Sequence, residues 1–339
     1  MRRKWLCLGL ILLLVLLAAA CGTRQEASPT AAGNAAEEDS ANGGPAGSST
    51  GTGATEETQE TRTIRYLDKE YTVPAKTERI VITGSLEAME DALVLGVKPV
   101  GAMTVGGKFP DMFAAITDSA ESIGEKQQPN VETILKLKPD VILSTTKFPP
   151  DVSEKLVKIA PTIPVSHIST NWEANLRLLA ELTGKQEQAE QVLQEYKDDV
   201  AEAKAKLGDR LKGKKVVIIR IRSGNIMIYP QNVFFNPSLY EDLGLAAPEE
   251  IKIAKAQEAI SLEKFSEMNP DYIFVQFSED ENADHPKALE DLQNNPIWKS
   301  INAVKNNKVF VNVVDPLAQG GTAWSKIHFL KAAVEKLSQ

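Results

Sequence analysis

Cysteine and histidine are scarce in this sequence of 339 residues. The two cysteines are Cys7 and Cys21, and Cys7 falls in an apolar leader that we expect to be removed. The mature chain therefore has no cysteine pair for a disulfide, and its apolar core must stabilise the fold. The histidines are His167, His285 and His328, and no two of them have the i, i+4 spacing of a zinc-binding helix. We predict no metal site made of protein ligands.

Common catalytic motifs are also missing. The sequence contains no HExxH, no P-loop and no dinucleotide-binding fingerprint. Ser85 follows a predicted strand, as the serine of a nucleophile elbow does, but Thr83 and Glu87 occupy the positions of its two glycines. We therefore interpret Ser85 as a helix N-cap, predict no catalytic residues and expect that the protein is not an enzyme. An extracellular α/β hydrolase is retained as an alternative.

The chain has no excess of positive charge. It contains 38 Lys and Arg against 46 Asp and Glu, a formal net charge of −8. Removal of the leader, which carries three basic residues, would lower the net charge to −11. This balance argues against nucleic acid and anionic lipid as partners. An anionic ligand would need a local basic pocket.

The amino terminus has the pattern of a secretory signal peptide over 1–20. A basic stretch at 2–4 precedes an apolar run from Leu6 to Ala20, which is short for a membrane span. Ala18-Ala19-Ala20-Cys21 resembles a bacterial lipobox, with Ala18 where Leu is usual. The resemblance implies a diacylglyceryl group on Cys21 and a lipid anchor on the extracytoplasmic face of the cell membrane. Cleavage by ordinary signal peptidase remains the alternative.

Residues 21–60 are rich in Ala, Gly, Ser, Thr and Glu and contain no aromatic or large aliphatic side chain. Such a segment cannot bury a core, so we expect it to be disordered. Behind a lipidated Cys21 it would act as a flexible tether.

Strands and helices alternate from about residue 61 to the end, which predicts mostly parallel sheets covered by helices on both faces. In the first half we predict a hairpin over 63–73, strands over 79–83, 99–102, 141–143 and 162–165, and helices over 86–95, 131–137, 151–160 and 172–182. In the second half we predict strands over 215–221 and 272–275, helices over 236–243, 262–268 and 322–337, and a hairpin around Asn306-Asn307.

Two segments repeat one plan. VETILKLKPDVIL at 131–143 and LEKFSEMNPDYIF at 262–274 each place a Glu seven residues before a Pro, and Pro-Asp then opens an apolar strand. Asn130 and Ser261 precede the two helices as N-caps. The repeat predicts two similar Rossmann-like α/β lobes, at 61–183 and 209–339.

One long amphipathic helix joins these lobes. From Gly184 to Gly208 apolar residues recur every three or four positions, and no Pro or Gly interrupts the run. At 1.5 Å per residue this helix would span roughly 35 Å. A ligand would occupy the cleft between the lobes, and we expect the protein to act as a monomer.

Together these features resemble the solute-binding lipoproteins of ABC importers that have a single helical connector. This group takes up ferric siderophores, cobalamin, haem or metals. Within it, DPLAQGGTAWSK at 315–326 and RIRSGNIMIYP at 220–230 resemble the iron–siderophore branch. The resemblance implies a ferric (Fe³⁺) siderophore as ligand, no cofactor, and an ABC permease as partner. Haem or cobalamin remains the alternative, with His167 as a candidate axial ligand for haem.

The loops that follow the strands should line the cleft. The candidates are Met103, Lys108, Lys147 and Phe148 in the first half, and Arg222, Tyr229, Phe234, Phe277 and Trp324 in the second. Arg222 is the leading candidate, because a guanidinium donates two parallel hydrogen bonds to anionic oxygens. A surface salt bridge would explain Arg222 equally well, and Trp324 could instead belong to the core.

Glu132 and Glu263 occupy matched positions near the starts of two helices. Either one alone would be explained by its favourable interaction with the helix dipole. The resemblance implies that the pair docks on the permease, one carboxylate from each lobe.

For the ligand we expect a hydroxamate or citrate-hydroxamate siderophore. A tris-catecholate would need a denser basic cluster than Arg222, Lys108 and Lys147 supply.

Overall fold

A computed structural model describes residues 60–339. The predicted signal peptide, the predicted lipidation site Cys21 and the predicted tether up to residue 59 lie outside the described residues. Within 60–339, no helix combines the length and the apolar character that a membrane crossing requires. The same range holds no cluster of three or more His, Cys, Asp or Glu side chains arranged to hold a metal ion.

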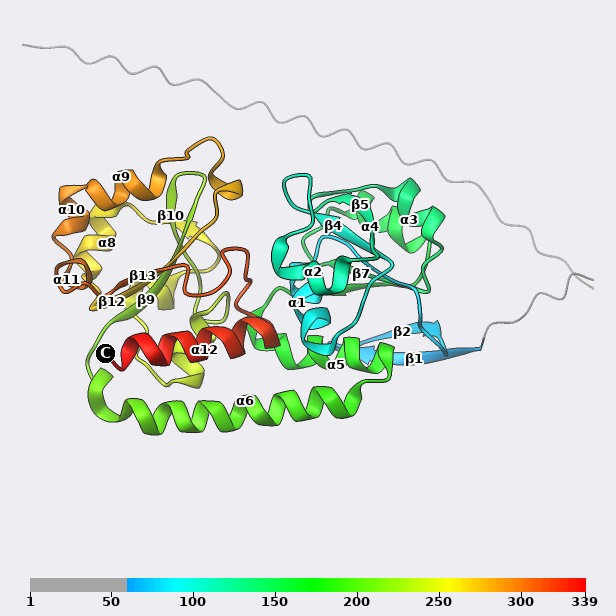
Figure 1. Ribbon diagram of the computed structural model, residues 1–339, viewed down its shortest axis with the longest axis horizontal. Coiled ribbons are helices and arrows are strands. Elements are labelled where there is room, and N and C mark those ends of the chain that lie inside the picture. Colours follow the sequence, from blue (N-terminus) through cyan, green and yellow to red (C-terminus); the bar gives the residue numbers. More distant parts are fainter. Residues whose placement is uncertain (1–59) are drawn as a thin grey trace, which may run out of the picture. The chain divides into compact units, whose positions relative to one another are not determined.

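The first lobe is built on a six-stranded sheet with the order β6-β5-β4-β3-β7-β8 (Figure 1). All neighbouring strands are parallel except β5 and β6. The strands are β3 (Ile80–Ile82), β4 (Gly101–Thr104), β5 (Glu121–Glu125), β6 (Gln128–Pro129), β7 (Val141–Thr145) and β8 (Thr162–Val165). The helices are α1 (Leu86–Leu95), α2 (Ala114–Thr117), α3 (Val131–Leu137), α4 (Pro150–Val157) and α5 (Trp172–Thr183). The predicted hairpin is confirmed as β1 (Thr61–Tyr66) and β2 (Lys69–Pro74).

The second lobe is built on a five-stranded sheet with the order β11-β10-β9-β12-β13. Strand β12 is parallel to β9 and β13, whereas β10 is antiparallel to its two neighbours. The strands are β9 (Val216–Arg222), β10 (Asn225–Ile228), β11 (Glu258–Ala259), β12 (Tyr272–Phe277) and β13 (Val309–Val311). The helices are α7 (Glu249–Ile253), α8 (Leu262–Met268), α9 (Ala288–Asn294), α10 (Pro296–Lys299), α11 (Asn302–Lys305) and α12 (Ala323–Leu337).

The repeated segments form the same local structure. Asn130 caps α3 by accepting from the Thr133 amide, and Ser261 caps α8 in the same way. The helices end at Lys138 and Asn269, which share a left-handed conformation with φ 46°.

The Asp of each Pro-Asp then ties the turn to the central strand of its lobe. Asp140 Oδ2 accepts from the Arg79 amide at 2.8 Å, and Asp271 Oδ2 accepts from the Lys215 amide at 3.0 Å. The predicted repeat is therefore confirmed: the two segments share their N-caps, their helix ends and the hydrogen bond of the Asp.

The connecting helix is α6 (Gln186–Leu207), within two residues of the predicted bounds at each end. It buries Ala189, Leu193, Tyr196, Ala203 and Leu207 along one face. This face packs against α5 and α12, and α12 also packs against α1 (Figure 1). One apolar core therefore runs from the first lobe through these four helices into the second. The lobes are therefore joined by the packed layer of α1, α5, α6 and α12 as well as by the covalent chain.

Two predicted elements differ in the structure. Asn306-Asn307 is not the turn of a hairpin, because β12 and β13 are parallel and α9, α10 and α11 form the crossover between them. A parallel neighbour requires such a crossover, and the turn only joins α11 to β13. The helix predicted over 236–243 is a short π-helical turn, Ser238–Asp242.

Candidate functional site

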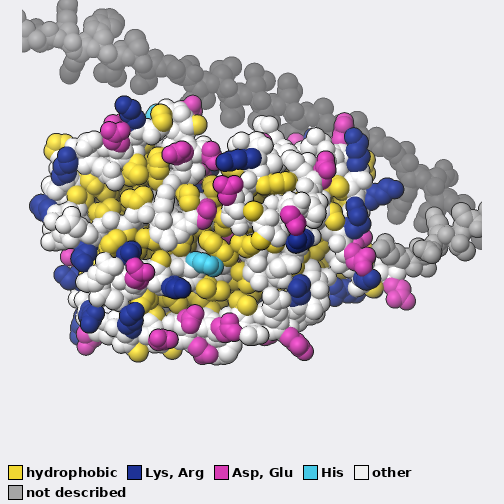
Figure 2. Space-filling view, in the orientation of Figure 1, with side chains coloured by type: hydrophobic (Ala, Val, Ile, Leu, Met, Phe, Trp, Pro, Cys, Tyr) yellow, Lys and Arg dark blue, Asp and Glu magenta, His cyan; other side chains and the backbone are white. Residues whose placement is uncertain are grey.

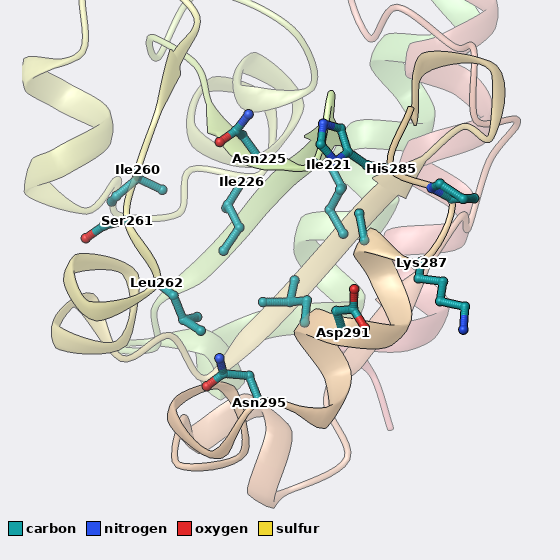
Figure 3. A pocket seen from close by; sticks show the side chains of 14 residues that line it. Ile221, Asn225, Ile226, Ile260, Ser261, Leu262, His285, Lys287, Asp291 and Asn295 are labelled. Carbon is teal, nitrogen blue, oxygen red and sulfur yellow. The ribbon is translucent and has the colours of Figure 1, made fainter. Parts of the chain in front are cut away.

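One cavity of about 620 Å³ lies within the second lobe (Figure 3). Its apolar lining includes Ile221 and Ile226 on the β9–β10 hairpin and Leu292 of α9. Its charged lining residues are Lys287 and Asp291, whose charges cancel. None of the residues predicted to bind ligand lines this cavity, and it offers little to an anionic ligand.

A second cavity of about 350 Å³ is lined by both lobes. Lys147 follows β7, His167 follows β8 and Arg222 ends β9, so the cavity lies beyond the carboxyl ends of the parallel strands. Ligands of open α/β sheets bind at this edge. Its charged lining residues are Glu87, Lys126, Lys147, Arg220, Arg222, Lys255 and Glu281. On the face in view in Figure 2, acidic and basic side chains are interspersed over the surface.

Arg220 and Arg222 supply the positive charge of the second lobe. They are two residues apart on β9, so both side chains lie on the same face of the sheet. Arg220 is only 5% exposed, and its Nε donates to Glu281 Oε2 at 2.6 Å. Arg222 Nε lies 3.7 Å from the other oxygen of Glu281, and its Nη1 donates to Gln257 at 3.4 Å.

One nitrogen of the two guanidinium groups is buried without a hydrogen-bond acceptor among the described residues. Arg220 Nη2 is buried and has no hydrogen-bond partner within residues 60–339. A buried polar group without a partner is costly, and a charged donor more so. An anionic acceptor placed in the cavity would satisfy it.

The first lobe contributes Lys126 and Lys147. Lys147 Nζ lies 3.3 Å from Glu87 Oε1. Burial works to raise the pKa of Glu87, but Lys147 and Lys126 hold that pKa below its usual value. Burial lowers the pKa of Lys126 to about 8, and the positive charges of Lys147 and Arg220 act in the same direction. A bound anion would relieve this repulsion.

His167 lines the same cavity, and its Nδ1 lies 2.9 Å from Thr146 Oγ1. Burial and Lys147 both lower the pKa of this histidine. The imidazole is therefore uncharged at neutral pH and adds polarity to the wall without adding charge.

Two aromatic rings form the wall beside Arg220. Tyr229 and Phe234 are stacked with their centroids 4.4 Å apart, and the Arg220 guanidinium lies 5.6 Å from the centroid of Phe234. Phe234 has a φ of 62°, a conformation that non-glycine residues seldom adopt. Such strain is often found at ligand sites, where the surrounding structure maintains it.

The cavity brings together four of the nine predicted ligand-binding residues, namely Lys147, Arg222, Tyr229 and Phe234. Their contact with a ligand stays a prediction. Met103 and Phe148 are not among the residues that line the cavity, and both side chains are buried in the core of the first lobe, 1% and 9% exposed, so their contact with a ligand also stays a prediction. Met103 belongs to β4, a strand that is buried at every residue.

Lys108, Phe277 and Trp324 are not among the residues that line the cavity. Lys108 is exposed and follows a tight Gly106-Gly107 turn. Phe277 packs against the core at the end of β12. Trp324 is half-buried in the first turn of α12 and stacks on His328 with a centroid distance of 4.1 Å.

Four charged residues that line the cavity were not predicted from the sequence, namely Arg220, Lys126, Lys255 and Glu281. Arg220 left a detectable signal, since it is a charged residue inside the apolar strand VVIIRIR and shares a face with Arg222. Lys126, Lys255 and Glu281 lie in polar segments that look like ordinary surface loops. Glu132 and Glu263 are both exposed as the second residues of α3 and α8, and their docking role stays a prediction.

Known proteins resemble this chain in sequence and in structure. A family model described as periplasmic binding protein matches residues 82–312. The iron-uptake system-binding protein of Bacillus subtilis is 56% identical over 330 residues, which cover 97% of each chain. The crystal structure of the triscatecholate siderophore binding protein FeuA from Bacillus subtilis, complexed with ferri-bacillibactin, has 61% identity and a TM-score of 0.80. That match covers 82% of this chain and 98% of the other.

A more distant relative is the iron(3+)-hydroxamate-binding protein FhuD of Bacillus subtilis, which is 29% identical over 90% of this chain and 88% of its own length. The matched family and these relatives are binding proteins and not enzymes, which confirms the expectation drawn from the missing catalytic motifs. The arrangement of two lobes and the long helix α6 agrees with the structural match. The chain belongs to the periplasmic binding protein family.

Proposed function

We propose that the protein captures a ferric siderophore of the triscatecholate class and delivers it to the permease of an ABC importer. The observation that carries this proposal is the charge of the cavity between the lobes. Five basic side chains line it, namely Lys126, Lys147, Arg220, Arg222 and Lys255, against the two carboxylates Glu87 and Glu281.

The excess of three positive charges matches the ligand class. Three doubly deprotonated catechols around one Fe³⁺ leave the complex trianionic, whereas a ferric trihydroxamate is neutral. In a partly buried cavity three uncompensated cations would be unfavourable, so a trianion is the better occupant. The planar wall of Tyr229 and Phe234 offers apolar contact to aromatic catechol rings.

This proposal replaces the expectation of a hydroxamate or citrate-hydroxamate ligand. That expectation depended on a basic set limited to Arg222, Lys108 and Lys147. Lys108 is not among the residues that line the cavity, whereas Arg220, Lys126 and Lys255 are. The relative that binds ferri-bacillibactin, at 61% identity, supports the same class, and the hydroxamate-binding relative is much more distant.

Titration of the purified mature protein tests the ligand class. Isothermal calorimetry and intrinsic Trp fluorescence would be followed with a ferric triscatecholate, a ferric trihydroxamate, ferric citrate, haem and cobalamin. We expect the triscatecholate to bind at least about tenfold more tightly than the others, which corresponds to about 1.4 kcal/mol. Its affinity should fall as salt is added, because exposed charges are screened. Tighter binding of the trihydroxamate, haem or cobalamin would refute the proposed class.

We also propose that the mature protein is a monomer held at the extracytoplasmic face of the membrane by a lipid on Cys21. The two lobes of one chain suffice to form the cavity, so a partner copy is not needed for binding.

Replacement of Cys21 tests the anchor. Cys21→Ala should abolish incorporation of a clickable palmitate and release the protein from the membrane fraction, because the thiol that receives the lipid is gone. Cys7→Ala is the matched control, since it changes the other cysteine inside the leader, and it should be labelled like the wild type. Lipid label on the Cys21→Ala protein, or none on the wild type, would contradict the anchor.

A further inference from the structure

Helix α1 carries two carboxylates that are buried and do not line the cavity. Glu90 and Asp91 are 0% and 1% exposed. Glu90 Oε1 accepts from the backbone N–H of Gln319 at 2.8 Å, and Glu90 Oε2 accepts from the hydroxyls of Thr322 and Ser325. Glu90 belongs to the first lobe and its three donors belong to the second. These bonds therefore join the lobes directly.

The hydroxyl hydrogens of Thr322 and Ser325 both point toward Glu90. Thr322 Oγ1 accepts from the Ser325 amide at 3.0 Å, and Ser325 Oγ accepts from the Gly320 amide at 3.0 Å. Each hydroxyl is thus engaged as an acceptor by its own segment and has its hydrogen free for Glu90. Thr322 is also the N-cap of the fifteen-residue helix α12. Glu90 consequently holds the segment at 319–325 at the point where α12 begins.

This segment is part of the cavity structure. Gln319 and Phe234 both line the cavity. A Cβ on Gly320 would lie 2.4 Å from the carbonyl carbon of Phe234, and a Cβ on Gly321 would lie 2.4 Å from Ser169 Oγ. Ser169, from the first lobe, donates to the Phe234 carbonyl at 2.8 Å. The backbone beneath the cavity is therefore in tight contact, and a shift at 319–325 would be transmitted to Phe234.

We propose that Glu90 is a positioning residue for the ligand cavity: by holding segment 319–325 against α1, it fixes the placement of the basic side chains of one lobe relative to those of the other. The inference rests on the proposed function only in taking this cavity as the ligand site. Glu90 does not contact the ligand. Its effect on affinity comes from keeping Lys126 and Lys147 in register with Arg220 and Arg222, so that one trianion can reach all four.

The electrostatic surroundings make this contact sensitive to pH. Burial raises the pKa of Glu90 to about 7, and the negative charge of Glu87 adds to the shift, although the three hydrogen bonds oppose it. Burial also raises the pKa of Asp91, whose Oδ1 accepts from the Ala323 amide at 3.3 Å.

The other ionisable groups on the elements around α1 have partners elsewhere, are exposed or, like Glu181 on α5, are half-buried. On α12, the ammonium of Lys326 pairs with Asp242 at 2.6 Å. On α5, Arg177 pairs with Glu173 at 2.9 Å, and Asp111 beside α2 is exposed. On β1, the Tyr66 hydroxyl donates to Asn175 at 2.6 Å.

The sign of the pH effect follows from the raised pKa. A carboxyl whose pKa is higher in the folded state than in the unfolded state stabilises the fold below its unfolded pKa, and this contribution is lost as the pH rises through about 7. The contribution of Glu90 to the free energy of unfolding should therefore be most favourable in mildly acidic solution. Glu90→Gln, which stays neutral, should lack this pH dependence.

The test compares Glu90→Gln and Ser325→Ala with the wild type. Glu335→Gln is the control, because Glu335 is exposed near the end of α12 and pairs only with Lys336. Hydrogen exchange of the amides in 317–325, measured without ligand, should be about tenfold faster in both variants. Their Kd for the ferric triscatecholate should rise about tenfold, while the control matches the wild type. Between about pH 5.5 and pH 8 the Tm of the wild type should fall relative to that of Glu90→Gln.

Each outcome has one interpretation. If the wild type does not bind the triscatecholate, the proposed function fails, while the exchange and Tm results still test the lobe contact. If the wild type binds and both variants keep its Kd, the positioning role is overturned, even when exchange is faster, because Glu90 would then be only structural. Unchanged exchange in both variants, or a Tm difference that does not vary with pH, would also overturn it. If Ser325→Ala does not fold, the same measurements on Glu90→Gln decide the test.

Discussion

Replacement of Arg220 by alanine is expected to weaken binding of a ferric triscatecholate by at least a hundredfold. Its guanidinium is nearly inaccessible to solvent, it has one unused donor, and it lies against Phe234 in the wall of the cavity. A hydrogen bond to a charged group contributes about 1.5–3 kcal/mol, which corresponds to roughly tenfold to a hundredfold in Kd. Arg220 can offer more than one such bond, because its guanidinium is a planar fork.

Three further variants show whether affinity depends on the positive charge alone or also on the shape of the guanidinium. Arg222→Ala should cost about tenfold to a hundredfold, because Arg222 is more exposed and its contacts are longer. Arg220→Lys keeps the charge and loses the fork, so it should recover only part of the affinity. Lys108→Ala is the matched control, since it also removes one positive charge but lies outside the cavity. Calorimetric titration of each folded variant would decide. Wild-type affinity in Arg220→Ala, or an equal loss in Lys108→Ala, would contradict the assignment of this cavity.

A double change of Glu132→Ala and Glu263→Ala should impair iron uptake by about tenfold and leave ligand affinity unchanged. The two carboxylates are exposed at equivalent positions of α3 and α8, and neither lines the cavity. The N-caps Asn130 and Ser261 are retained, so both helices should still form. Charges at an interface rim govern orientation and association rate, and we propose that these two meet basic pockets on the permease.

The measurement pairs ligand titration with uptake of radioactive ferric triscatecholate in a strain that lacks the wild-type copy. Each single change should give an intermediate defect, because one lobe still docks. Glu154→Ala with Glu290→Ala is the control pair, since it removes one exposed carboxylate from each lobe at sites outside α3 and α8. Full uptake by the Glu132 and Glu263 double variant, or the same defect in the control pair, would disprove docking through these residues.

The sequence by itself determined the features that depend on neighbouring residues. The long helix α6 could be predicted because apolar side chains three and four positions apart meet on one helical face. The repeated segments could be predicted because their caps and their Pro-Asp turns act within a few residues. Ser85 was identified correctly as a helix cap, since its Oγ accepts from the Ala88 amide three residues later.

Only the tertiary structure decided which side chains share the cavity. Arg220 and Glu281 are 61 residues apart, and Glu90 lies 229 residues from Gln319, so no local pattern connects them. The same limit applies to Met103 and Phe148: the sequence shows that they lie within or after a strand, and only the structure shows that both side chains are buried in the core and do not line the cavity. Strand and helix periods are set by short-range sterics and hydrogen bonds. The charge of a cavity between two lobes is set by which distant loops the packed layer of α1, α5, α6 and α12 brings together.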